Sequence, residues 1–213
     1  MIKNSKNQFY TILLSLSFYV TACNNATHIS SKSAIEKITL NDSLGIIQLS
    51  IPQRYDTTFK WVHKSDCGIS CDEQKYSYQP KNLPIIMETG LLWKAPVDSV
   101  DRLTISRSMY LVSNNSDSAD IVATHRLIKE EIKFSADNMF FILDSVQKIN
   151  GRFYSIIAIE KFSNSYSGKV LATTIVKGND LKFEWDLKTS KIDSNTKKFI
   201  QESIGFIESI SID

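Results

Sequence analysis

Alternating apolar and polar positions run through most of the chain and predict a series of β-strands. Asn150-Gly151 is a strong signal for a tight hairpin turn, and Gly178-Asn179-Asp180 marks a second turn. Period-two alternation at 75–79 and 103–112, and β-prone apolar runs bounded by turn residues elsewhere, predict strands at 46–51, 59–63, 75–79, 103–112, 139–146, 152–162, 169–177 and 181–187. Because only short turns separate the last four strands, the pattern predicts a four-stranded meander.

Two segments instead have the spacing of amphipathic helices. In 117–134 the apolar residues recur near every third or fourth position, and Ser118 or Asp120 is a candidate N-cap. The segment 194–210 has a broad apolar face behind a candidate N-cap at Ser194. The order of strands, helix, four strands and helix predicts an α+β fold, with an antiparallel sheet on which a middle helix and a C-terminal helix pack.

The first 22 residues have the pattern of a secretion signal. Lys3 and Lys6 make a positive start, and the ten residues 11–20 form an apolar run relieved only by Thr and Ser. A membrane-spanning helix needs about 20 apolar residues, so this run is too short to cross a bilayer. It has the length of a signal-peptide core.

The four residues that end this segment resemble a known processing site. Val20-Thr21-Ala22-Cys23 is similar to the lipobox of bacterial lipoproteins, in which an aliphatic residue and two small or hydroxyl residues precede a Cys. The resemblance implies removal of 1–22 and attachment of diacylglycerol to Cys23, with membrane lipid as the partner. Two or more acyl chains anchor a protein stably without a spanning helix. The alternative is an ordinary secretion signal cut after Ala22.

The residues after Cys23 suggest a destination and a tether. Asn24 in place of Asp favours the outer membrane, with the protein facing the periplasm of the bacterial envelope. The Ser/Asn/Thr-rich stretch that follows lacks periodicity, so 23–37 is predicted to be a lipidated tether. The remaining 38–213 has the length of one domain.

The arrangement of this domain resembles the PsbP-like family over about 44–212. The resemblance lies in Ser50-Ile51-Pro52 ending an early strand, in the meander, and in the final amphipathic helix FIQESIGFIESISI. It implies a PsbP-like sandwich with a non-catalytic accessory or binding role, since members lack a shared active site. The stretch 53–100 departs from that pattern.

Composition excludes one class of partner. Removing Lys3 and Lys6 takes Lys+Arg from 25 to 23, which equals the 23 Asp+Glu. Because no basic stripe is present, nucleic acid is not expected as a partner. Motifs for phosphate cradles, serine hydrolases and zinc proteases are absent from the sequence, and no cofactor is predicted.

Cys67 and Cys71 allow two interpretations. In an oxidising compartment an even pair of cysteines favours a disulfide, here across the short loop CGISC. Alternatively, His63, Cys67 and Cys71 lie at i, i+4 and i+8 and would share one face of a helix as ligands for zinc or copper.

Two further groups are candidates for function. His125 lies one turn before Glu130 and Glu131 in the predicted middle helix, where a carboxylate–histidine pair acts as a base or simply forms exposed ion pairs. Aromatic residues gather before the midpoint and either line a binding surface or pack in the core: Phe59, Trp61, Tyr76, Tyr78 and Trp93.

The sequence therefore predicts a membrane-anchored envelope lipoprotein whose domain binds or scaffolds without catalysis. Its expected partner beyond lipid is an envelope protein or a small ligand. Two alternatives remain open: a metal-binding lipoprotein that uses His63, Cys67 and Cys71, and an envelope hydrolase whose active site the sequence does not identify.

Overall fold

The computed structural model describes residues 33–39, 45–64, 66, 72–85, 99–111, 118–135 and 139–213. The chain divides into two units, Met1–Ser30 and Ser31–Asp213, and all the elements described below belong to the second unit. They form a seven-stranded sheet, a three-stranded sheet and two helices.

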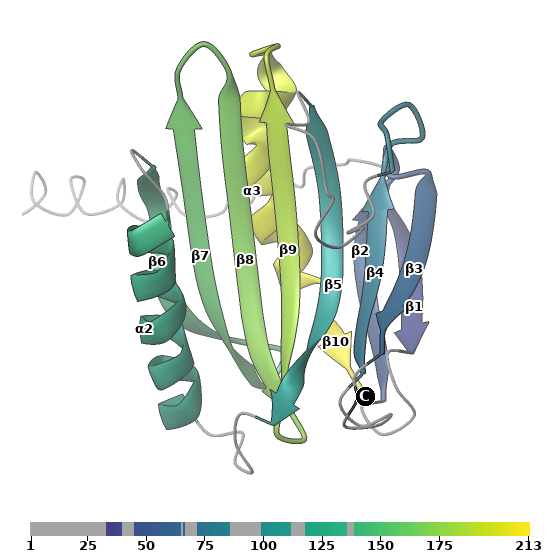
Figure 1. Cartoon of the computed structure of the whole chain (residues 1–213), viewed down its shortest axis with the longest axis vertical. Coiled ribbons are helices and arrows are strands. Elements are labelled where there is room, and N and C mark those ends of the chain that lie inside the picture. Colours follow the sequence, from purple (N-terminus) through teal and green to yellow (C-terminus); the bar gives the residue numbers. More distant parts are fainter. Residues whose placement is uncertain are drawn as a thin grey trace, which may run out of the picture. The chain divides into compact units, whose positions relative to one another are not determined.

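The larger sheet is antiparallel throughout, with the order β3-β4-β5-β9-β8-β7-β6 (Figure 1). Consecutive strands β6 to β9 lie side by side, so the predicted meander is confirmed. Strand β9 then pairs with β5, which joins the two halves of the sheet. The strands are β3 (Thr57–His63), β4 (Glu73–Gln79), β5 (Val100–Leu111), β6 (Phe140–Ile149), β7 (Arg152–Phe162), β8 (Tyr166–Val176) and β9 (Asn179–Thr189).

The first and last turns of the meander depend on residues with positive φ. Asn150 and Gly151 have φ of 48° and 83°, as a two-residue hairpin turn of type I′ requires. Lys177 and Gly178 have φ of 48° and 79° in the last turn. This turn lies one residue earlier than predicted, because Asn179 already pairs with Val176 and begins β9.

The smaller sheet has the order β1-β2-β10, formed by Ser33–Thr39, Ile46–Pro52 and Ser211–Ile212. Residues 33–37, which the sequence pattern assigns to the tether, thus pair with β2. Only Ile38 of β1 is buried, so the strand is held mainly by its backbone ladder. An edge strand of this kind leaves little hydrophobic alternation to detect.

The two helices lie on opposite faces of the larger sheet (Figure 1). Helix α2 (Ser118–Ser135) packs on β6 and β7, while α3 (Ser194–Glu208) packs on β8, β9 and also β2. Both helices begin within one residue of their predicted starts, and the α+β class with two packed helices is confirmed. Neither helix combines the length and the apolarity needed to cross a membrane.

The start of α3 is fixed by a reciprocal pair of hydrogen bonds. Thr196 donates its N–H to Asp193 Oδ1 at 3.2 Å, and Asp193 donates its N–H to Thr196 Oγ1 at 3.3 Å. Asp193 rather than Ser194 is therefore the N-cap, and the helix begins at the residue that follows it.

The core lies between the larger sheet, α3 and β2. Its fully buried members come from every one of these elements, which is why neither sheet is expected to be stable without the other. They include Ile47 and Leu49 of β2, Leu103 of β5, Phe183 and Trp185 of β9, and Phe199 and Ile207 of α3.

Candidate functional site

His125 joins α2 to the sheet beneath it. Its Nδ1 is 2.8 Å from Ser155 Oγ on β7, and its Nε2 is 2.7 Å from Asp144 Oδ1 on β6. Lys129, one turn further along α2, forms an ion pair with the other carboxylate oxygen of Asp144. The carboxylate partner of His125 is thus Asp144 on a strand, and not Glu130 or Glu131 as the sequence suggested.

This cluster contains the residue types of a serine hydrolase triad, but its geometry serves docking of the helix. Ser155 is only 1 % exposed beneath α2, so no substrate carbonyl reaches its hydroxyl. The Lys129 hydrogen bond lowers the pKa of Asp144 against the opposing effect of burial, and the His125 bond lowers it further. The ionised carboxylate therefore accepts hydrogen bonds from two successive turns of α2.

We expect Asp144→Ala to lower the free energy of unfolding by about 1–2 kcal/mol near neutral pH, because it removes charge-assisted bonds to Lys129 and His125. Urea denaturation measures this change. The contribution of Asp144 is present above the ordinary pKa of a carboxyl and is lost as the pH falls through the lowered value. The control is Glu130→Gln, which replaces an exposed side chain on the same helix. An equal loss of unfolding free energy in both variants would contradict the docking role.

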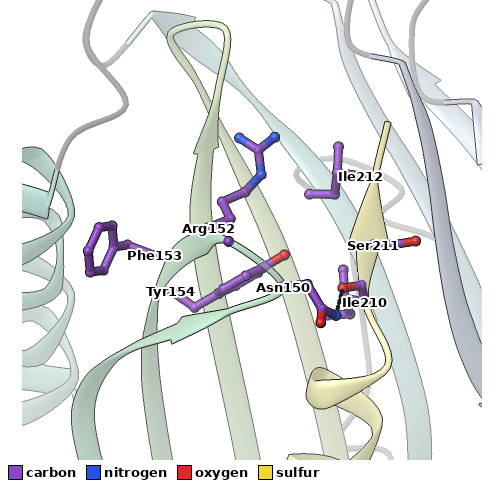
Figure 2. A pocket seen from close by; sticks show the side chains of 8 residues that line it. Asn150, Arg152, Phe153, Tyr154, Ile210, Ser211 and Ile212 are labelled. Atoms are coloured by element: carbon purple, nitrogen blue, oxygen red, sulfur yellow. Dashed lines mark hydrogen bonds between the residues drawn. The ribbon is translucent and has the colours of Figure 1, made fainter.

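A pocket of about 310 Å³ opens between the β6–β7 turn and β10 (Figure 2). It brings together two parts of the chain that are some 60 residues apart, as the hydrogen bond from Asn150 to Ile210 illustrates. We call it the Arg152 pocket; its lining residues are Asn150, Gly151, Arg152, Phe153, Tyr154, Ile210, Ser211 and Ile212.

The polar groups of the Arg152 pocket are well defined. Asn150 donates from Nδ2 to the carbonyl oxygens of Ile210 (2.8 Å) and Glu208 (3.2 Å), which fixes the turn against the end of α3. Arg152 donates from Nη1 to the Ile175 carbonyl at 3.3 Å, and its other donors have no partner among the described residues. Figure 2 shows its guanidinium next to Ile212 and Tyr154.

Tyr154 adds a neutral hydroxyl to the same pocket. Burial raises the pKa of this phenol to about 12, although the nearby Arg152 charge acts in the opposite direction. The hydroxyl therefore stays protonated at neutral pH, and its side chain is 1 % exposed at the floor of the pocket. A cation beside the partly exposed side chain of Ile212 has the features of a site for a ligand with both an anionic and an apolar part.

A second charged group lies on the face of the larger sheet opposite α3. Lys169 Nζ is 2.7 Å from Glu184 Oε1 and 3.3 Å from Asp186 Oδ1. Burial and the Glu184 charge raise the pKa of Asp186 to about 7. Burial also opposes ionisation of Glu184, but Lys169, the hydrogen bond with Asp186 and the Arg102 charge together outweigh it and hold the pKa of that carboxyl below its ordinary value. The Lys169 ammonium thus largely neutralises the charge of Glu184 and Asp186.

The sulfur and lipid sites predicted from sequence lie outside the described residues, since Cys23, Cys67 and Cys71 all do. His63 is the last residue of strand β3, opposite Glu73 in the register. The metal-site hypothesis requires His63, Cys67 and Cys71 to share one face of a helix, but His63 belongs to a strand. Among the residues that the structure describes, no three His, Cys, Asp or Glu side chains form a metal-binding group.

The predicted aromatic cluster is divided between two faces of the sheet. Phe59 and Trp61 stack with ring centroids 5.4 Å apart, at the edge strand β3. Tyr76 and Tyr78 lie opposite Lys60 and Thr58 in the register, on the other face, and Tyr78 is buried in the core. The remaining member, Trp93, lies outside the described residues.

Sequence reasoning did not identify the Arg152 pocket. Arg152 follows the Asn150-Gly151 turn and looks like any residue at the start of a strand. Only the return of the chain at Ile210–Ile212 makes it part of a pocket, and hydrophobic periodicity carries no information about such distant pairing.

Comparison with known proteins gives limited likenesses. No protein-family model matches the chain, and no curated protein matches its sequence. Among solved structures, cyanobacterial PsbP (CyanoP) from Synechocystis sp. PCC 6803 is similar with a TM-score of 0.49 and 11% identity, over 84% of this chain and 93% of that one. LpqN, involved in cell envelope biogenesis of Mycobacterium tuberculosis, has a TM-score of 0.40 and 8% identity, over 85% of this chain and 91% of its own. Likenesses of this size assign neither a family nor a function.

Proposed function

We propose that this chain is a non-catalytic binding protein of the bacterial envelope, anchored to a membrane through acylated Cys23, and that its folded unit binds an anionic ligand group in the Arg152 pocket. The observation that carries the binding role is the pocket itself, where a guanidinium with unused donors lies near the partly exposed side chain of Ile212. Its volume is at the lower end of the range for small-ligand sites, about 300–1,000 Å³.

The non-catalytic character is supported by the arrangement around His125. The Ser–His–Asp combination found among the described residues uses its hydrogen bonds to dock α2, with the Ser155 hydroxyl buried. A hydrolase needs that hydroxyl open to a substrate carbonyl.

Anchoring is supported by the lipobox-like residues Val20-Thr21-Ala22-Cys23. The nine residues between Cys23 and β1 allow a separation of at most about 35 Å, so the folded unit would stay close to the lipid surface. Asn24 favours the outer membrane, with the unit facing the periplasm. In that oxidising compartment Cys67 and Cys71 would pair as a disulfide, so the unreduced protein would contain no free thiol.

The anchor is tested by the mass of the N-terminal peptide and by labelling with an alkyne fatty acid. We expect the native chain to begin at Cys23, to carry diacylglycerol and to be labelled, whereas Cys23→Ala should lose essentially all label. Cys67→Ala and Cys71→Ala are the controls and should be labelled normally. An unmodified thiol on Cys23 in membrane-extracted protein would contradict the anchor.

The binding role is tested separately with N-acetylvaline, which has one carboxylate and one apolar side chain. In calorimetric titration of the full chain in detergent, Arg152→Gln should weaken binding about tenfold, the worth of a hydrogen bond to a charged group. Arg126→Gln, an exposed change on α2, is the control and should bind as the native chain does. Absence of binding, or equal binding by Arg152→Gln, would contradict the proposed site.

A further inference from the structure

Among the strands that the structure describes, β10 pairs with β2 alone and is an edge strand of the three-stranded sheet. Its register places Ser211 opposite Gln48 and Ile212 opposite Ile47. Asp213 donates its N–H to the Ile46 carbonyl at 3.1 Å, so Asp213 and Ile46 form a hydrogen-bonded pair of the ladder. Since bonded and non-bonded pairs alternate in an antiparallel ladder, Ile212 is in a non-bonded position. Its N–H and C=O therefore point away from β2.

The side to which they point is the Arg152 pocket. The carbonyl of Ile210, two residues before Ile212, has the same orientation and accepts a hydrogen bond from Asn150 on the pocket side. Ile212 lines that pocket, and no described residue bonds its N–H or C=O there. The pocket thus combines an unused backbone donor and acceptor with a guanidinium that has unused donors.

An unpaired strand edge binds extended peptides by adding a strand to the sheet, and the main-chain bonds supply affinity. We infer that the Arg152 pocket takes a short extended peptide, whose main chain pairs with Ile212 and whose carboxylate binds Arg152. This inference rests on the proposed function and names the ligand class of the same site. The cation accounts for the carboxylate, and the partly exposed side chain of Ile212 accounts for an apolar side chain on the peptide.

The tripeptide acetyl-Val-Thr-Val with a free carboxylate tests this pairing against N-acetylvaline, in titrations of the full chain. Two added main-chain bonds should make the tripeptide bind at least about tenfold more tightly. Because successive amides of a strand point to opposite sides, N-methylation of one of two adjacent amides should weaken binding about tenfold, and methylation of its neighbour far less. Arg152→Gln should weaken the binding of both the tripeptide and N-acetylvaline.

A variant removes the donor from the protein side. Ile212→Pro deletes the N–H that faces the pocket and leaves the bonds to β2, as proline permits on an edge strand. Ile212→Pro should bind the tripeptide no more tightly than N-acetylvaline, and its affinity for N-acetylvaline should equal that of the native chain. Ile212→Val should bind both ligands as the native chain does. A thermal melt shows whether Ile212→Pro is folded. If it is not, binding of the N-methylated tripeptides to the native chain tests strand addition instead.

The outcomes separate the two proposals. If the tripeptide binds no more tightly than N-acetylvaline while both depend on Arg152, strand addition is wrong and the anionic site stands. If methylation of adjacent amides weakens binding equally, strand addition is also wrong. If neither ligand binds, both proposals are wrong. Tighter tripeptide binding with alternating sensitivity to methylation supports the inference.

Discussion

Replacing Trp185 by alanine is expected to lower the free energy of unfolding by about 3–5 kcal/mol, the cost of truncating a large aromatic side chain in a packed core. Trp185 is 0 % exposed on the central strand β9, between Leu103 of β5 and Val170 of β8 in the register. It also stacks on Phe183 with ring centroids 6.4 Å apart. The cavity would thus open where both halves of the sheet meet.

Trp61→Ala is the matched control, because the same truncation falls on a half-buried residue of the edge strand β3. Its cost should be no more than about 1 kcal/mol, since no enclosed cavity forms. Trp185→Phe should cost well under half as much as Trp185→Ala, because it also removes a buried Nε1 that has no partner among the described residues. Urea denaturation measures all three, and equal losses at positions 61 and 185 would refute the proposed centre of the core.

The elements that could be predicted from sequence are those whose signals are local. The Asn150-Gly151 turn requires two residues that tolerate positive φ, and these residue types stand out in the sequence. Strand β9 alternates in burial because one face packs on α3, whereas β7 and β8 stand out as short runs of apolar and β-branched residues. The meander and the C-terminal helix therefore follow from turn chemistry and periodicity.

The parts that could not be predicted depend on distant pairing. Strand β1 has one buried apolar side chain, and β10 has only two residues, so neither has a detectable period. Both exist because β2 offers them a ladder. The Arg152 pocket and the true partner of His125 have the same origin, since Asp144 and Ile210 reach these sites from other elements of the fold.

Asp186→Asn is expected to stabilise the protein at alkaline pH, by at least about 1 kcal/mol near pH 8, and to change little near pH 4. Burial and the Glu184 carboxylate raise the pKa of Asp186 from 3.8 to about 7. As the pH rises, the unfolded chain releases this proton first, while the folded chain keeps it until about pH 7. The folded state therefore binds more protons across this window, so the contribution of Asp186 to stability falls as the pH rises.

Asparagine has the size of aspartate but no charge to desolvate, so the variant should lose this decline. Lys169 keeps its bond to Glu184 at 2.7 Å, which leaves the ammonium paired in the variant. The lowered pKa of Glu184 acts in the opposite direction. The Lys169 and Arg102 charges that contribute to it are common to both proteins, and the asparagine amide can donate in place of the Asp186 hydrogen bond. Urea denaturation at the two pH values gives that difference, with Glu208→Gln on the surface of α3 as the control. If the variant were less stable than the native chain near pH 8, the attraction between Lys169 and ionised Asp186 would stabilise the folded chain by more than burial of that carboxylate costs, and the prediction would be wrong.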